Sequence, residues 1–138
     1  MKLIARVVFL LISIHMNLNC YSQEAKESNT FKQTIIGETK VLGKLEIAEK
    51  DFPDTMTFEN AQLFCAKLGS GWRLPTIEEL HLLYQNKKTI KGFSDTNYWS
   101  CTMGSDTFAW KEDFKDSFSS YEYDSNIKCR VRAVRSFK

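Results

Sequence analysis

The feature that most constrains the fold is the stretch GWRLPTIEEL at residues 71–80. Pro75 restricts Leu74 to extended backbone and prevents a helix from continuing backward through it. Thr76 is a favourable N-cap, and Glu79, three residues later, completes a capping box. Whatever the rest of the chain does, an extended corner must precede a helix at this point.

A helix is predicted on each side of this corner. Upstream, Thr57 is an N-cap and Gly69 a helix-ending glycine. Between them runs one apolar stripe at helical spacing, made of Phe58, Ala61, Phe64, Cys65 and Leu68. Downstream, a second stripe is made of Ile77, Leu80, Leu83 and Tyr84. Residues 72–74 therefore join two amphipathic helices.

In an extended segment, Trp72 and Leu74 would point to one side and Arg73, which lies between them, to the other. Its fork of donors suits carbonyls or a carboxylate, so we expect it to brace the corner, and this structural role is favoured over a ligand-facing one. The three tryptophans, Trp72, Trp99 and Trp110, lie in short motifs with small neighbours. Core packing is favoured for them over stacking on an exposed ligand.

The remaining segments are typical of strands. In residues 41–48, Leu45 and Ile47 share one face, and further strands are predicted at residues 98–102, 108–114, 119–123 and 129–135. In the last of these, Val131 and Ala133 are expected to point inward and the arginines outward. The order predicts an α+β domain with two helices packed on a twisted antiparallel sheet.

The N-terminus has the pattern of a secretory signal peptide over residues 1–22, with a basic start and a short apolar core. The apolar run is shorter than the roughly 20 residues of a membrane span. A packed N-terminal helix, an uncleaved anchor and a lipoprotein bearing lipid on Cys20 stay as alternatives. We therefore expect an exported protein (secreted, periplasmic or at the cell surface), with a flexible tether at residues 23–34 and a domain at 35–138.

The net charge and the residue types present argue against several classes of partner. Lys2 and Arg6 are two of the 19 basic residues, so residues 23–138 carry 17 bases (19 minus 2) and 17 acids. Such a balance argues against nucleic acid or an anionic membrane as partner, and no stable membrane span remains after cleavage. No metal or cofactor motif is present. His81 is the one histidine after residue 22 and is expected to be structural or exposed.

Several ordered motifs resemble the Lcl C-terminal domain family, also called DUF1566. They are MTF at 56–58, GWRLPT at 71–76 with Glu79 and Leu80, YWS at 98–100, AW at 109–110 with Phe114, and VRAVR at 131–135. Within them lie Leu74, Pro75, Thr76, Trp99, Trp110 and Arg132, which the resemblance marks as structural motif residues. The similarity covers residues 45–137. It implies a fold related to C-type lectins and to formylglycine-generating enzymes, in a bacterial exported or surface protein.

The resemblance also bears on the cysteines, of which Cys65, Cys101 and Cys129 remain after the signal. An odd number leaves at least one unpaired in a monomer. Many family members carry a cysteine where Ala133 stands, whereas Cys129 comes four residues earlier, about 13 Å along a strand. A Cys65–Cys129 bridge is therefore disfavoured, and a Cys101–Cys129 bridge across neighbouring strands fits at least as well.

From these observations we expect a non-catalytic binding or adhesion module for an extracellular ligand, a carbohydrate or a surface protein. A structural accessory domain and an enzyme with a site near Cys101 or Cys129 are the alternatives. Tyr121 and Tyr123, on a polar hairpin outside the motifs, are the candidates for an exposed contact surface. The lectin-type calcium triplets and the paired cysteines of formylglycine-generating enzymes have no counterpart here.

Overall fold

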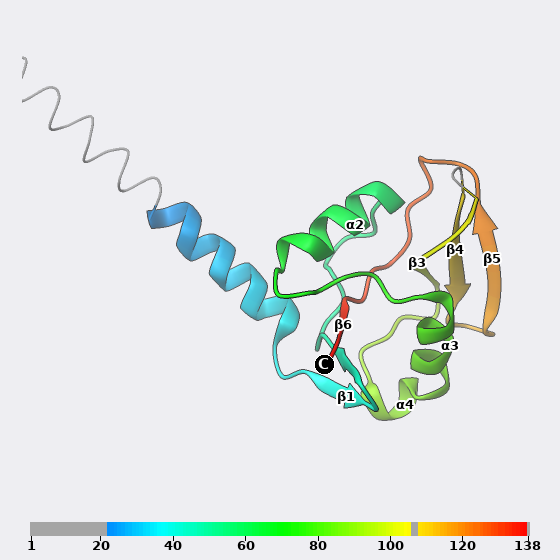
Figure 1. Ribbon diagram of the computed structural model, residues 1–138, viewed down its shortest axis with the longest axis horizontal. Coiled ribbons are helices and arrows are strands. Elements are labelled where there is room, and N and C mark those ends of the chain that lie inside the picture. Colours follow the sequence, from blue (N-terminus) through cyan, green and yellow to red (C-terminus); the bar gives the residue numbers. More distant parts are fainter. Residues whose placement is uncertain (1–21, 106–107, 138) are drawn as a thin grey trace, which may run out of the picture. The chain divides into compact units, whose positions relative to one another are not determined.

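The computed structural model describes residues 22–105 and 108–137 (Figure 1). By its internal contacts the chain divides into two units, Met1–Thr34 and Ile35–Lys138. All but the last residue of the predicted signal peptide, Cys20 included, lies outside the described residues. Among the helices described, none combines the length and the apolar character needed to cross a membrane.

Residues 22–36 are helical, whereas the sequence predicts a flexible tether at 23–34. No glycine or proline interrupts them, so local backbone bonding can continue along the whole segment. The hydroxyls of Thr30 and Thr34 donate to carbonyls four residues earlier, each at 2.9 Å. Apart from Ile35 and its neighbour Ile36, the segment is almost wholly exposed. The polar residues that suggest a flexible tether therefore belong to a solvent-exposed helix.

The strands confirm the α+β class but form two sheets where one was predicted. The first sheet has the order β1-β2-β6, with β1 at Lys40–Leu42, β2 at Leu45–Ile47 and β6 at Val134–Ser136. The second has the order β3-β4-β5, with β3 at Asn97–Ser105, β4 at Phe108–Asp113 and β5 at Phe118–Glu122. All pairs are antiparallel.

The division into two sheets has a local cause. Gly43, at a φ of +61°, turns the predicted single strand into the β1–β2 hairpin. The chain end then pairs with β2 instead of extending the second sheet, as Figure 1 shows. The β3–β4–β5 meander is thereby left with β5 as a free edge.

The helices follow the predicted caps. Helix α2 runs from Phe58 to Lys67 behind the N-cap Thr57, and α3 runs from Ile77 to Gln85 behind Thr76, where the capping box is formed. A short helix, α4, follows at Lys87–Ile90. Helix α2 packs on β3, and α3 packs on β3 and β4. Helix α2 therefore contributes to one apolar cluster of the core and α3 to the other.

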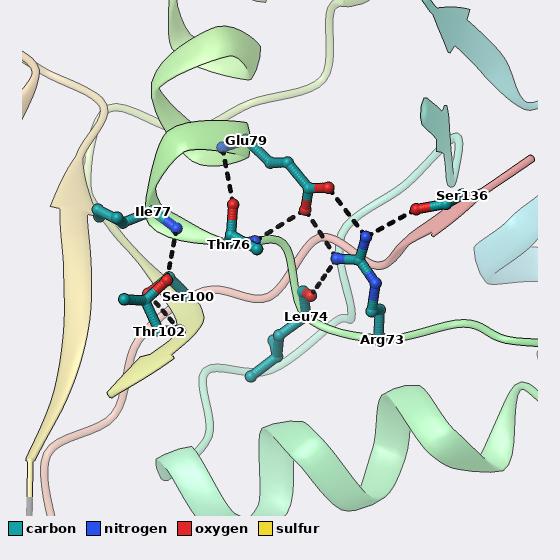
Figure 2. A network of polar contacts seen from close by, with 8 residues as sticks. All are labelled: Arg73, Leu74, Thr76, Ile77, Glu79, Ser100, Thr102 and Ser136. Carbon is teal, nitrogen blue, oxygen red and sulfur yellow. Dashed lines mark hydrogen bonds and ion pairs between the residues drawn. The ribbon is translucent and has the colours of Figure 1, made fainter. Parts of the chain in front are cut away.

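The corner between the helices is held by one arginine (Figure 2). Arg73 donates twice to the Glu79 carboxylate, at 2.7 and 2.9 Å, and also to the Leu74 carbonyl and the Ser136 hydroxyl. It makes both kinds of bond that the sequence predicts. Burial acts to raise the pKa of Glu79, but the hydrogen bonds from Arg73 and from the backbone of Thr76 bring that pKa below its usual value.

The same corner is attached to the second sheet. Thr102 accepts a hydrogen bond from the backbone of Ile77 at 3.0 Å, and the N–H of Cys101 donates to the Pro75 carbonyl at 2.7 Å. The backbone of Arg73 pairs with Val134, the first residue of β6. The residues that precede α3 are thus tied to both sheets at once.

Arg132 contradicts the prediction that the C-terminal arginines point outward, because it is only 1% exposed. Its guanidinium donates to the Asp51 carboxylate at 2.6 Å and to the carbonyls of Ala48 and Gly92, and it lies 4.2 Å from the centre of the Phe93 ring. Alternation applies to a strand with one solvated face. Here both faces of the segment are enclosed, and these partners satisfy the charge.

Candidate functional site

Two of the three tryptophans are core residues and the third is not. Trp72 is 4% exposed and Trp99 is 2% exposed, and the Trp99 indole donates to the Met56 carbonyl at 2.8 Å. Trp110 is only partly buried, contrary to the prediction that all three pack inside. It lies on the face of β4 opposite to Ala109, paired in register with Tyr121.

One concave site, of about 220 Å³, lies where the start of α2 faces the β3–β4–β5 sheet. We call it the aromatic cleft. It is lined by Phe58, Glu59, Trp99, Met103, Phe108, Ala109, Glu122, Tyr123, Asp124 and Ser125. Segments far apart in the sequence supply these side chains, so only the folded domain forms the site.

Four rings form one group that reaches the cleft through Phe108 and Tyr123. Phe108 packs against Tyr121 and Tyr123, each with ring centres 4.9 Å apart, and Trp110 meets Tyr121 edge-on at 5.5 Å. Tyr121 is 47% exposed and Tyr123 is 64% exposed, and Tyr123 lines the cleft. The two tyrosines selected from the sequence therefore belong to a larger aromatic group, with one of them at the cavity.

The polar side of the cleft is acidic. Glu122 accepts a hydrogen bond from Lys111 at 2.7 Å, and this bond lowers the pKa of Glu122, so its carboxylate is ionised at neutral pH. Asp124 accepts from the backbone of Asn126 at 2.8 Å. Glu59 has no hydrogen-bond or ion-pair partner within the part of the chain that the structure describes.

The Tyr123 hydroxyl stays neutral at the same pH. A hydrogen bond with Tyr121 raises the pKa of Tyr123 above its ordinary value, which is already near 10. The cleft therefore offers rings and carboxylates, but no phenolate. Lysine, arginine and histidine are absent from its lining residues.

The cysteines are free thiols, and the proposed Cys101–Cys129 bridge is not formed. The backbone of Cys129 pairs with Met56, whereas Cys101 bonds to Pro75 at the corner, so the two residues have different neighbours. Burial raises the pKa of Cys65 and of Cys129 to about 12. Burial also raises the pKa of the half-buried Cys101.

His81 lies beside a buried carboxylate and a hydroxyl. Its Nδ1 atom is 3.2 Å from the Glu112 carboxylate and 3.2 Å from the Ser117 hydroxyl, and that hydroxyl donates to Glu112 at 2.9 Å. In a nucleophilic triad the serine and the acid use opposite ring nitrogens. Here both contact the same nitrogen, and Nε2 contacts Gln85, so this geometry cannot relay a proton from Ser117 through the ring.

The sequence did not predict the place of several residues in the aromatic cleft. The sequence predicts Phe58 only as part of the buried stripe of α2, and it predicts no contact for Glu59. One signal was available, because Phe108 and Trp110 alternate on one strand as Tyr121 and Tyr123 do on the next. Among the described residues, no three His, Cys, Asp or Glu side chains are grouped to hold a metal ion.

The family model described as the Lcl C-terminal domain matches residues 22–135, which include the whole corner, both sheets up to Arg135, and every residue that lines the aromatic cleft. No curated protein matches the chain.

Proposed function

Because this chain belongs to the Lcl C-terminal domain family, we propose that it is an exported module that binds an extracellular ligand, a carbohydrate or a surface protein, without catalysing a reaction. The aromatic cleft is the ligand site in this proposal. A C-type-lectin-like fold, which the sequence resemblance implies, is part of the same proposal. The two helices packed on antiparallel strands are consistent with it.

The observation that carries the proposal is the exposure of rings at a concave site. Tyr123 is largely open to solvent and Phe108 is partly open, whereas other aromatic side chains of this domain, such as Phe52 and Phe114, are buried in its core. Exposed rings beside polar groups in a cavity are typical of ligand sites, since they offer a large rigid contact area with few side-chain rotations to lose on binding. A purely structural accessory domain gives no reason to keep them at the surface.

Two features support a module without catalysis. The thiols of Cys65 and Cys129 are protonated at neutral pH, and the thiolate is the nucleophilic form of cysteine. His81 faces Glu112 and Ser117 through one ring nitrogen and is therefore not arranged as a base for that hydroxyl. The proposal of export rests on the N-terminal sequence pattern. It is tested by measuring the mass of the mature protein, which shows whether residues 1–22 have been removed.

The binding proposal is tested with immobilised glycans, cell-wall fragments and matrix proteins, using the purified chain and a Tyr123→Ala variant. We expect at least one class of probe to bind the wild type and to lose about five- to tenfold in affinity with the variant, because a stacked ring contributes about 1 kcal/mol or more. Phe118→Ala is the matched control, since Phe118 is 67% exposed at the start of β5, the strand that ends just before Tyr123, but does not line the cleft.

Two results would count against the proposal. One is that no probe binds the wild-type chain. The other is that a probe binds equally well to the wild type, Tyr123→Ala and Phe118→Ala, which would place the ligand away from the aromatic cleft.

A further inference from the structure

The walls of the aromatic cleft present rings in two groups. Phe58 meets the Trp99 indole edge-on, with ring centres 5.7 Å apart, and Phe108 meets Tyr123 at 4.9 Å with an interplanar angle of 63°. A cation is attracted to the face of such a ring when it comes within about 6 Å of the ring centre. Rings on both sides of a cavity can therefore enclose a positively charged group.

The charge of the cleft has one sign. Glu59, Glu122 and Asp124 line it, and none of its lining residues is basic. Lys111 forms an ion pair with Glu122. Three carboxylates less one ammonium leave two negative charges, and these belong to Glu59 and Asp124.

Other ligand classes fit these features less well. A phosphate, a sulfate or an anionic sugar would face carboxylates with no arginine or lysine to receive it. A neutral sugar could stack on the rings, but it would give the excess carboxylates no opposite charge. The described residues hold no cluster of three metal-ligating side chains, and the rings that separate the acids supply no oxygen ligands.

The size of the cleft limits what can enter it. Its volume of about 220 Å³ is below the roughly 300–1,000 Å³ of typical small-molecule pockets. It therefore suits the end group of a longer ligand. The rest of that ligand would extend over the exposed ring of Tyr123.

We propose that the aromatic cleft recognises an alkylammonium group at the end of its ligand, held between the two pairs of rings and balanced by Glu59 and Asp124. This inference rests on the proposed binding function and specifies the chemistry of its ligand. An ammonium group of this kind can come from a lysine side chain or from a quaternary amine, and both share the charge and the alkyl surface that the cleft complements.

The probes are choline and the uncharged alcohol in which a carbon atom replaces its nitrogen. The two have nearly the same shape, so a difference between them reports the charge. With the isotope-labelled chain in two-dimensional NMR, choline should shift the amide signals of the cleft residues saturably. The neutral isostere should bind about tenfold more weakly. All titrations are made at one ionic strength, because salt screens exposed charges.

A second arm distinguishes the source of the ammonium group. Lysine with its main-chain amine acetylated and its carboxyl group blocked as a methylamide keeps a free side-chain ammonium, and it is titrated beside choline under the same conditions. Tighter binding of the lysine derivative indicates a basic protein segment as the natural partner, and tighter binding of choline indicates a quaternary amine. Either result supports recognition of an ammonium group.

Variants test the two halves of the site. Glu59→Gln combined with Asp124→Asn removes two charges and keeps the Asp124 oxygen that caps Asn126, and we expect affinity for choline to fall about tenfold. Phe108→Leu removes one ring and should cost about fivefold. Asp116→Asn is the matched control, because Asp116 also caps a backbone N–H two residues on but lies outside the cleft, and it should leave choline binding unchanged.

Folding of each variant is checked by urea unfolding, so that a loss of binding is interpreted only for folded protein. Equal affinity for choline and its neutral isostere would overturn the inference, and so would undiminished choline binding by the double variant. If neutral glycans bind at the cleft while neither ammonium probe does, this inference fails and the proposed binding function stands. If no probe of any class binds there, both fail.

Discussion

The corner around Arg73 and the aromatic cleft use similar residue types in opposite ways. At the corner, a guanidinium and a carboxylate form two bonds with each other, and the remaining donors find Leu74 and Ser136. At the cleft, Glu59 has no described partner and the Tyr123 ring is mostly open to solvent. The corner satisfies its polar groups internally, whereas the cleft leaves the Glu59 carboxylate and the Tyr123 ring available. The proposed ligand surface therefore lies away from the corner, which carries the motif GWRLPT.

The largest expected effect comes from replacing Arg132, a buried arginine whose polar groups are also satisfied inside the protein. Arg132→Met would leave the Asp51 carboxylate buried beside an apolar side chain. We expect the free energy of unfolding in urea to fall by about 3–5 kcal/mol, the usual cost of removing one partner of a buried ion pair. Arg130→Met is the control, since Arg130 is half-buried and bonds one carbonyl, and it should cost less than about 1 kcal/mol.

The thiols give the next largest expected effect. With a pKa of about 12, Cys65 and Cys129 should react with a thiol reagent at neutral pH about a thousandfold more slowly than the cysteines of the unfolded chain. Half-buried Cys101 should react first. Labelling rates followed by mass spectrometry, with a sample in denaturant as reference, check this order. Rapid native labelling of Cys65 or Cys129 would revive the enzymatic alternative.

A smaller effect is expected at the corner itself. Glu79→Gln weakens the paired bonds to Arg73 and should lower the free energy of unfolding by about 1–2 kcal/mol, because both side chains are partly exposed. Aromatic-cleft binding should not change. A loss of ligand affinity in the folded variant would join the two regions that the comparison separates.

The same variant has a pH signature. Since folding lowers the pKa of Glu79, the stability contributed by that carboxylate is complete above its unfolded pKa of about 4.3 and is lost as pH falls through the lower folded value. The wild type should therefore lose stability as pH decreases below about 4.5, and Glu79→Gln should lose less. Part of the slope should persist, because Arg135 also lowers the pKa of Glu46.

The smallest effect on stability is expected at the cleft. Tyr123→Ala removes an exposed ring, and the free energy of unfolding should change by no more than about 0.5 kcal/mol. Urea midpoints of this variant and of Phe118→Ala should agree closely. A Tyr123→Ala variant that unfolds as easily as Arg132→Met would identify the aromatic group as a part of the core.

Local rules predicted most of the secondary structure. Thr57 and Thr76 mark helix starts by their own hydrogen bonds to nearby backbone, so neither needs a distant partner. The strands predicted at residues 108–114 and 119–123 match β4 and β5 to within one residue at each end. The bonding of Arg73 to a carboxylate was also predictable, because the capping-box glutamate lies six residues away, within reach of the side chain.

What escaped prediction depends on distant segments. The environment of Arg132 is supplied by Asp51, Ala48 and Gly92, and alternation along one strand carries no information about them. The cleft likewise combines Glu59 from a helix with Asp124 from a segment more than 60 residues later (124 minus 59 is 65). Only Tyr121 and Tyr123 were selected from sequence, because exposed aromatics on a polar hairpin are unusual locally.

The pairing of β2 with β6 has a consequence for how the molecule is made. Residues 45–47 hydrogen-bond to residues 134–136, so the first sheet closes a loop of nearly ninety residues. During synthesis this sheet can form only after the final strand has left the ribosome, whereas the β3–β4–β5 meander can assemble earlier from neighbours in the chain. We expect slow folding with late completion, since distant contacts carry the largest loop-closure entropy.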